Sequence, residues 1–176
     1  MRKIGFIGVG IMGRSMVRNL MKAGYEVHIY ARTKAKVEDV ISEGAVFHDS
    51  IAECVKDRDA VITIVGFPQD VEEVYFDSGN ILDSASPGTY LIDMTTTSPM
   101  LAEKICEEGT KRGFHVLDAP VTGGDTGAKE GTLSILVAVS ARTMKHAILF
   151  LRRWGRISIM RVRQAAGSTV SWQTRS

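Results

Sequence analysis

The chain has 176 residues, of which 44% are hydrophobic and 24% are charged. This length fits one globular domain, or one domain and part of another, and it excludes a large multidomain protein. The two cysteines are far apart and have no CxxC spacing, so the sequence indicates neither a disulfide framework nor a structural metal site. No apolar run approaches the roughly 20 residues that span a bilayer, and the N-terminus has no cleavable signal pattern. We therefore expect a soluble, cytoplasmic protein without membrane contact.

The formal net charge of +2 is distributed unevenly along the chain. Residues 1–140 contain 14 basic and all 20 acidic residues, whereas residues 141–176 contain eight basic residues and no acidic one. Both tryptophans, Trp154 and Trp172, also lie in this basic tail. Such a tail is typical of contact with nucleic acid or a membrane surface, but an abrupt change in composition also arises when the tail has a different origin.

Short apolar runs alternate with helical patterns from the N-terminus onward. The runs predict strands at 3–8, 26–30, 45–47, 60–65, 90–94, 115–117 and 133–137. Helical spacing of apolar residues predicts helices at 11–21, 34–42, 51–55, 71–76 and 99–112. This alternation predicts a Rossmann-type α/β fold with a doubly wound parallel sheet, because right-handed crossovers place helices on the sheet faces. We expect the domain to cover residues 1–137.

A glycine-rich turn follows the first predicted strand and opens the first helix. Its residues are Gly8, Val9, Gly10, Ile11, Met12 and Gly13. In a dinucleotide-binding turn the first glycine permits the tight bend, the second lets the backbone approach a pyrophosphate, and the third allows close packing of helix on strand. The helix N-terminus offers free N–H groups to the phosphates. The alternative is a loop that needs glycines for turning alone.

The end of the second predicted strand distinguishes the two nicotinamide cofactors. An NAD site usually has Asp or Glu there to bind the ribose 2′-hydroxyl, but this chain has no carboxylate at that position. It has instead Arg32, Thr33 and Lys36, which offer a guanidinium, a hydroxyl and an ammonium to a 2′-phosphate. This pattern favours NADP over NAD. The alternative is a set of solvated residues at a helix start.

Several other polar residues have simpler interpretations. The four histidines show no metal-ligand spacing. Asp93 and Asp118 are predicted at strand ends, where a carboxylate commonly caps a turn. We therefore assign neither a metal site nor a catalytic carboxylate.

Three motifs follow one another within residues 1–137. They are Gly5-Phe6-Ile7-Gly8-Val9-Gly10-Ile11-Met12-Gly13, Leu91-Ile92-Asp93-Met94-Thr95-Thr96-Thr97-Ser98-Pro99, and Asp118-Ala119-Pro120-Val121-Thr122-Gly123-Gly124. Together they closely resemble the β-hydroxyacid dehydrogenases, the group of 3-hydroxyisobutyrate dehydrogenase, tartronate semialdehyde reductase and glyoxylate/succinic semialdehyde reductase. The resemblance implies a Rossmann domain followed by an all-helical domain, hydride transfer between NAD(P) and a small hydroxy acid or semialdehyde, and homo-oligomers among complete relatives.

The same resemblance implies roles for particular residues. The turn 8–13 would hold the pyrophosphate, and Ile64, Val65 and Gly66 would lie under the nicotinamide half of the cofactor. Thr96 would contact the cofactor near the reacting carbon. The substrate carboxylate would be held by Thr122, Gly123 and Gly124 through a hydroxyl and N–H groups. From the residues alone, that last segment also fits a plain turn.

The catalytic residue of the family has no counterpart here. The resemblance implies a lysine in a Gly-x-Gly…Lys-x-x-Asn pattern at the start of the second domain, where it acts as general acid or base on the carbonyl oxygen. No such lysine exists in this sequence, and no catalytic residue is assigned. We expect residues 138–176 to form a basic, poorly ordered tail, because no core pattern is present there.

Our hypothesis for this tail is a shifted reading frame. When the tail is back-translated from Leu151 and read from the third base of each codon, suitable synonymous codons yield EAMGKNINYEGEAGSGQHSKLANQI, the continuation typical of the family. The absence of acidic residues after Glu130 supports the same origin. Sequencing the gene from codon 130 onward tests the hypothesis, and a single long frame without a slip near Val137 would contradict it.

The sequence therefore favours the NADP-binding domain of a hydroxyacid dehydrogenase without its second domain, for which we expect at best weak cofactor binding and no turnover. Two non-catalytic alternatives remain open: a cofactor sensor, and a nucleic-acid binder that uses the basic tail. Titration of nicotinamide fluorescence distinguishes a sensor from an inactive fragment. A salt-dependent nucleic-acid complex that is lost on deletion of residues 138–176 would favour the binder.

Overall fold

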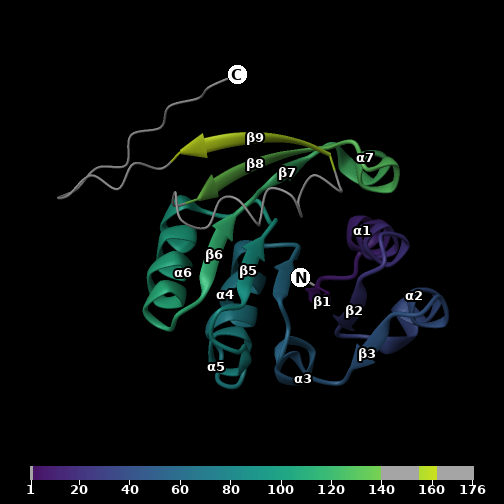
Figure 1. Cartoon of the computed structure of the whole chain (residues 1–176), viewed down its shortest axis with the longest axis horizontal. Coiled ribbons are helices and arrows are strands. Elements are labelled where there is room, and N and C mark those ends of the chain that lie inside the picture. Colours follow the sequence, from purple (N-terminus) through teal and green to yellow (C-terminus); the bar gives the residue numbers. More distant parts are fainter. Residues whose placement is uncertain (1, 140–154, 162–176) are drawn as a thin grey trace.

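The computed structural model describes residues 2–139 and 155–161, and their strands form one sheet (Figure 1). The strands are β1 (Lys3–Ile7), β2 (Glu26–Tyr30), β3 (Val46–His48), β4 (Ala60–Thr63), β5 (Tyr90–Asp93), β6 (His115–Asp118), β7 (Val121–Thr122), β8 (Leu133–Val139) and β9 (Gly155–Arg161). The helices are α1 (Ile11–Lys22), η1 (Lys34–Val37, a 3₁₀ turn), α2 (Glu38–Ser42), α3 (Ile51–Val55), α4 (Pro68–Phe76), α5 (Ile81–Ser84), α6 (Pro99–Lys111) and α7 (Gly124–Glu130). The predicted Rossmann-type α/β fold is confirmed.

Six parallel strands form the main part of the sheet, in the order β3, β2, β1, β4, β5, β6. The N-terminal strand β1 is therefore internal, with Ile4 paired to Val27 of β2 on one side and to Ala60 of β4 on the other. Because parallel strands are joined by crossovers, their carboxyl ends lie at the same edge of the sheet. This edge bears the loops that contain the sequence motifs.

The strand predicted at 133–137 differs from the prediction in its direction. β8 pairs antiparallel with β6 through Asp118 and Ala138, and antiparallel with β7 through Val121 and Ile135. The prediction of a parallel strand here is wrong, because β7 and the short helix α7 reverse the chain instead of carrying it across the sheet. β9 then pairs parallel with β8.

The helices cover both faces of the sheet (Figure 1). On one face, α1, α2 and α7 contribute to a core around Phe6, Met16 and Ile29, all of them buried. On the other face, α3, α4, α5 and α6 contribute to a second core around Tyr75, Leu91 and Ile105. Burial on both faces explains why the central strands read as continuous apolar runs and do not alternate with polar residues.

The boundary predicted after Val137 falls inside β8. Of the predicted tail, the structure describes Ala138 and Val139 as the end of β8, and Gly155–Arg161 as β9. Residues 140–154 and 162–176, with both tryptophans, lie outside the described residues. The predicted division at Val137 and the predicted character of the tail therefore stay predictions.

Some helices differ from their predicted extents. The helix predicted at 34–42 is divided into η1 and α2, which meet between Val37 and Glu38. Neither α5 nor α7 was predicted, because each is shorter than two turns or glycine-rich and shows little apolar periodicity. The buried part of α7 is limited to Gly127 and Ala128, and α7 packs against α1.

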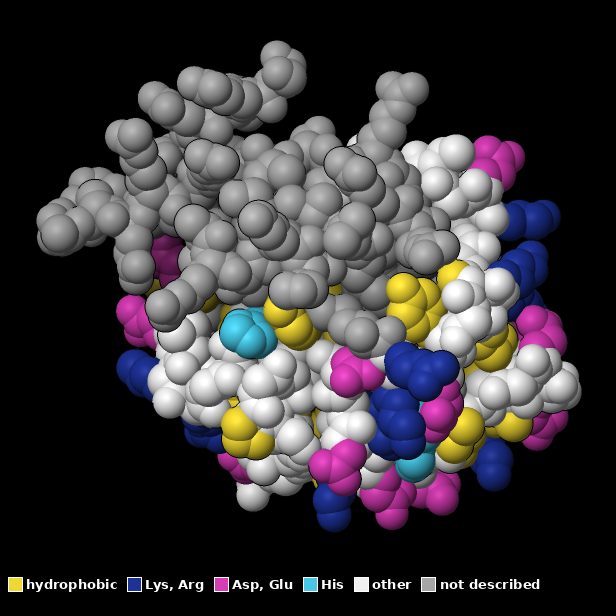
Figure 2. Space-filling view, viewed as in Figure 1, with side chains coloured by type: hydrophobic (Ala, Val, Ile, Leu, Met, Phe, Trp, Pro, Cys, Tyr) yellow, Lys and Arg dark blue, Asp and Glu magenta, His cyan; other side chains and the backbone are white. Residues whose placement is uncertain are grey.

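Charged side chains of opposite sign lie side by side on the surface. On the face shown in Figure 2, basic and acidic side chains are interspersed over the described part of the chain. Arg18 of α1 is one example, since its guanidinium lies 2.7 Å from Asp39 and 2.6 Å from Glu43. These two carboxylates raise the pKa of Arg18 and connect α1 to the segment that contains α2.

Two histidines are hydrogen-bonded to each other between β2 and β3. The Nδ1 atom of His28 lies 2.8 Å from Nε2 of His48, and Nε2 of His28 lies 2.8 Å from a carboxylate oxygen of Glu26. Burial lowers the pKa of both histidines, and Arg58 lowers it further, while Glu26 partly offsets this effect at His28. Both imidazoles are therefore neutral in the folded protein at neutral pH.

We expect this histidine pair to make stability depend on pH below about 6.5, the ordinary histidine pKa. In that range the unfolded chain binds protons that the folded chain does not, so the stability contributed by the pair is lost as the pH falls. Urea unfolding midpoints at pH 7.5 and 5.5 measure the effect. His48→Gln is expected to reduce the loss; an equal loss in the wild-type protein and the variant would contradict the assignment.

Candidate functional site

The turn between β1 and α1 requires two of its three glycines for purely steric reasons. Gly8 has a φ of 98°, and a Cβ at this position would overlap the backbone oxygen of Ile64. A Cβ on Gly13 would overlap the backbone oxygen of Gly8. The backbone of α1 therefore lies directly on the turn, and the turn lies directly on the segment that follows β4.

Gly10 differs from these two glycines. Its φ is −81°, and apart from the adjoining backbone no heavy atom lies within 4 Å of the position that its Cβ would occupy. Gly10 is exposed, and it is the N-cap residue of α1, where the first turn has no acidic residue and no side-chain cap. The open space beside Gly10 and the free helix N-terminus fit an anionic group such as a pyrophosphate.

The three other residues of the turn differ in how far their side chains are buried. The side chain of Val9 is buried in the core, and Met12 packs against the same core. Ile11 is 78% exposed at the start of α1. Of these three side chains, Ile11 is the most exposed to a ligand, Met12 is partly exposed, and Val9 offers its backbone alone.

The residues predicted to bind a 2′-phosphate follow β2. Arg32, Thr33 and Lys36 are all exposed, and the hydroxyl of Thr33 does not cap η1. The Arg14 guanidinium of α1 donates a hydrogen bond to the backbone oxygen of Lys36 and lies 3.3 Å from a carboxylate oxygen of Asp39. Arg14 therefore fixes this segment on the first turn of α1, next to the glycine turn.

Arg32 does not stand free at this position. Its Nη2 atom lies 2.5 Å from Oδ1 of Asp70 and 3.4 Å from Oε2 of Glu73, both on α4. These contacts raise the pKa of Arg32. The guanidinium that the sequence predicts to recognise a phosphate thus has two carboxylate partners within the protein.

The loops after β4 and β5 are joined by buried hydrogen bonds. The backbone N–H of Val65 donates to the hydroxyl of Thr95 over 3.0 Å, and the N–H of Thr95 donates to Oδ1 of Asp93 over 3.1 Å. The hydroxyl of Thr63 donates to the same oxygen of Asp93 over 2.8 Å. Thr95, Asp93 and Thr63 are all buried, so this chain of bonds fixes the Val65 loop relative to Thr96.

Two carboxyl groups lie on neighbouring strands beside this network. Asp93 of β5 is the register partner of Asp118 of β6, and both end their strands. Burial raises the pKa of both groups, and the Asp93 charge helps to raise that of Asp118 to about 7. Asp93 caps the Thr95 turn as predicted from the sequence, and one of its oxygens, Oδ2, is buried without a hydrogen-bond partner. With a pKa of about 7, Asp118 is therefore present in both its protonated and its ionised form at neutral pH.

The predicted substrate segment connects β7 to α7. Thr122 ends β7 and is exposed, as are Gly123 and Gly124. The two glycines have φ values of 128° and 61°, which are conformations that favour glycine. The side-chain amide of Asn19 on α1 donates to the backbone oxygen of Ala128 on α7 over 2.9 Å, so this segment is fixed to the same helix as the glycine turn.

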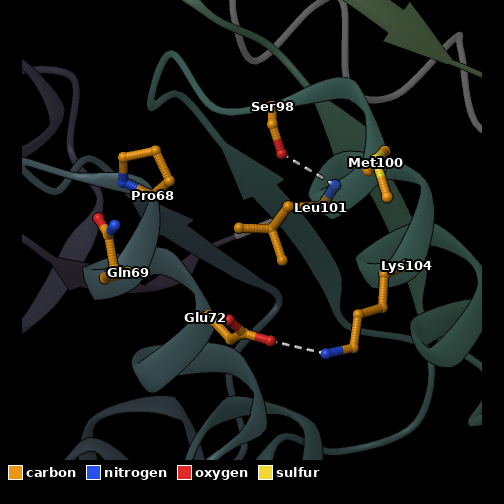
Figure 3. Close-up of a pocket in the computed structure, with 7 residues that line it drawn as sticks. All are labelled: Pro68, Gln69, Glu72, Ser98, Met100, Leu101 and Lys104. Carbon is orange, nitrogen blue, oxygen red and sulfur yellow. Dashed lines mark hydrogen bonds and ion pairs between the residues drawn. The ribbon is translucent and has the colours of Figure 1, made fainter.

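A separate hollow of about 350 Å³ lies between the first turns of α4 and α6 (Figure 3). Its walls are Pro68, Gln69, Glu72, Ser98, Met100, Leu101 and Lys104. Lys104 lies 2.7 Å from Glu72 across the hollow, and the Ser98 hydroxyl accepts a hydrogen bond from the N–H of Leu101. None of the predicted cofactor residues lines it, so this hollow does not mark the site predicted from the sequence.

Two features are absent from residues 2–139 and 155–161. No helix there is both long enough and apolar enough to cross a bilayer. No group of three or more His, Cys, Asp or Glu side chains in the same ranges is arranged to hold a metal ion.

Sequence reasoning overlooked three residues around the site. Arg14 is a basic residue in the first turn of a helix, which is electrostatically unfavourable and therefore signals a tertiary partner. Asp70 follows a proline at a helix start, which is a sign of a cap but not of an ion pair with a distant strand end. Thr95 has no signal that separates it from the two threonines that follow it.

Known proteins are similar to this chain in both sequence and structure. A family model described as the NAD binding domain of 6-phosphogluconate dehydrogenase matches residues 3–166. The uncharacterized oxidoreductase YkwC of Bacillus subtilis is 49% identical over 136 residues, which cover 77% of this chain and 47% of that protein. A 3-hydroxyisobutyrate dehydrogenase of Pseudomonas aeruginosa is 35% identical over 156 residues, which cover 89% of this chain and 52% of that protein.

A solved structure gives the same result for the fold. The structure of Mycobacterium tuberculosis 3-hydroxyisobutyrate dehydrogenase with L-serine has a TM-score of 0.85 and 31% sequence identity to this chain. The match covers 92% of this chain and 55% of that one. The chain spans about half the length of the curated relatives that it matches.

Proposed function

Because the chain belongs to the family of the NAD binding domain of 6-phosphogluconate dehydrogenase, with relatives named 3-hydroxyisobutyrate dehydrogenase, we propose that it binds NADP in preference to NAD. The family confirms the resemblance predicted from the three motifs, and the NAD-binding Rossmann domain with it. The observation that supports binding most directly is the turn 8–13, where Gly8 and Gly13 are sterically required and Gly10 leaves open space.

The residues proposed to hold the cofactor come from four loops at one edge of the sheet. The pyrophosphate lies on the backbone of the turn 8–13 and the N-terminus of α1. Arg32, Thr33 and Lys36 bind the 2′-phosphate, while Ile64, Val65, Gly66 and Thr96 lie along the nicotinamide half. When bound, the nicotinamide supplies or accepts the hydride of the reaction.

The proposed reaction of the whole protein is hydride transfer between NAD(P) and a small hydroxy acid or semialdehyde. Thr122, Gly123 and Gly124 would hold the substrate carboxylate by charge-assisted hydrogen bonds. We propose that this chain alone has no turnover, since it has no counterpart of the family lysine that exchanges a proton with the carbonyl oxygen. Reduction of a semialdehyde by the purified chain with NADPH would contradict this proposal.

The remaining proposals concern the context of the chain. Residues 138–176 are proposed to be an out-of-frame continuation, and the protein is proposed to be cytoplasmic; homo-oligomers are expected among its complete relatives. Contact with nucleic acid is not part of the proposal, because a shifted frame accounts for the basic tail without it.

Arg32→Ala tests the proposed cofactor preference. The Kd for NADPH is expected to rise about tenfold or more, because charge-assisted hydrogen bonds to the 2′-phosphate are lost, while the Kd for NADH stays within about twofold. Nicotinamide fluorescence titration measures both constants. Lys34→Ala is the matched control, since it removes the same charge two residues away, where Lys34 lies over the Phe47 ring. Equal losses for NADPH and NADH, or none, would refute the preference.

A further inference from the structure

The ion pair between Arg32 and Asp70 crosses the edge of the sheet where the cofactor is proposed to bind. Arg32 follows β2, and Asp70 lies in the first turn of α4, which follows β4. β2 and β4 lie on either side of β1, whose carboxyl end leads into the glycine turn. The contact between Nη2 of Arg32 and Oδ1 of Asp70, at 2.5 Å, therefore joins the two loops that flank this turn.

Asp70 is held in place more firmly than its partner. The side chain of Asp70 is 19% exposed, whereas that of Arg32 is 65% exposed. The second carboxylate oxygen of Asp70 accepts a hydrogen bond from the N–H of Phe67 over 3.1 Å, so it also caps α4. Glu73 lies one turn further along α4, with a carboxylate oxygen 3.4 Å from the same guanidinium. Arg32 thus has two negative partners, one of them fixed.

We propose that Asp70 is a specificity-determining residue, which competes with the 2′-phosphate of NADP for Arg32 and thereby reduces the preference for NADP over NAD. The inference rests on the proposed role of Arg32. When NAD is bound, the neutral ribose hydroxyl leaves the Arg32–Asp70 pair intact. When NADP is bound, Arg32 must leave Asp70 or share its charge between a carboxylate and a phosphate, and the two anions repel each other.

Asp70→Asn is the variant that tests this competition. Asparagine has the same shape, and its side-chain oxygen still accepts the hydrogen bond from Phe67, so α4 keeps its cap. The Kd for NADPH is expected to fall about threefold, as an exposed ion pair of ordinary strength is no longer given up, and the Kd for NADH is expected to stay unchanged. A melting temperature close to that of the wild-type chain would show that the variant keeps the fold.

Two further variants make the result specific. Glu72→Gln removes the same charge from the neighbouring face of α4, where Glu72 pairs with Lys104 at 2.7 Å (Figure 3), and it is expected to leave both constants unchanged. In the double variant Arg32→Ala with Asp70→Asn, the gain in NADPH affinity is expected to vanish, because Asp70 acts through Arg32.

The outcomes separate this inference from the proposed function. Weaker or unchanged NADPH binding by Asp70→Asn would overturn the inference, and weaker binding would mean that Asp70 orients Arg32 toward the phosphate. A gain that persists without Arg32 would overturn it as well. Full NADPH affinity in Arg32→Ala alone would instead overturn the proposed cofactor preference. If neither cofactor binds the wild-type chain or any variant, both proposals fail.

Discussion

Gly8→Ala is expected to destabilise the domain by about 3 kcal/mol or more, which is among the largest effects available to a single methyl group. The positive φ of Gly8 disfavours any other residue, and its Cβ would overlap the backbone oxygen of Ile64. The overlapping atoms of Ile64 belong to its backbone and not to a flexible side chain. The overlap can therefore be removed only if β1 and the loop after β4 move apart. The free energy of unfolding in urea measures the loss.

Gly10→Ala is the matched control for Gly8→Ala, and the two glycines are only two residues apart. At Gly10 the backbone is extended and the space around a Cβ is empty, so the expected loss of stability is below about 1 kcal/mol. NADPH binding is expected to weaken at least tenfold, because the methyl group would occupy the space proposed for the pyrophosphate. A Gly10→Ala protein that binds NADPH normally would contradict the placement of the pyrophosphate.

Thr95→Val is expected to reduce both stability and cofactor affinity. The variant keeps the shape of threonine but leaves the N–H of Val65 without its acceptor, at a cost of about 1–3 kcal/mol. Freed from Thr95, the Val65 loop no longer has a fixed position relative to Thr96, and we expect the Kd for NADPH to rise about tenfold. Unfolding in urea and fluorescence titration measure the two effects.

A second buried threonine provides the control for Thr95. The hydroxyl of Thr89 donates to the backbone oxygen of Arg58 over 2.9 Å, and Thr89 is as buried as Thr95, but it lies before β5, at the opposite edge of the sheet. Thr89→Val is expected to lose similar stability and to keep its affinity for NADPH. Thr95→Ser is expected to restore affinity, since serine retains the hydroxyl. Equal loss of affinity in the two valine variants would show that Thr95 is merely structural.

The sequence predicted the parallel part of the fold well because two signals coincide there. Central strands such as β4 are apolar on both faces, and the glycines of the turn 8–13 follow the first of these strands directly. The bounds of β2 and α3 agree with their predicted residues. Strand direction depends on the connection and not on the strand, so β8 was assigned the wrong direction once the short reversal through β7 and α7 was overlooked.

The site was predictable only where a residue acts through its local backbone. Gly8 and Gly13 are two such residues, because the close backbone packing of the turn itself leaves no space for a Cβ at either position. Arg32 was selected for its charge, but its partner Asp70 is 38 residues away and belongs to a different loop. Such pairs arise from the order of the strands in the sheet, and neither the sequence around Arg32 nor the sequence around Asp70 indicates that order. The role of Thr95 likewise depends on the adjacency of β4 and β5.

The internal position of β1 in the sheet affects when the domain can fold during synthesis. Within this sheet, β1 precedes the other strands in the sequence, and one of its two edges remains unpaired until β4 is available, beginning with the contact between Ile4 and Ala60. Until then the nascent chain presents an apolar strand with an open edge, and non-local parallel pairing of this kind forms slowly. Folding of this domain should therefore begin only after Thr63 has been synthesised, and any chain that stops earlier should be prone to aggregation.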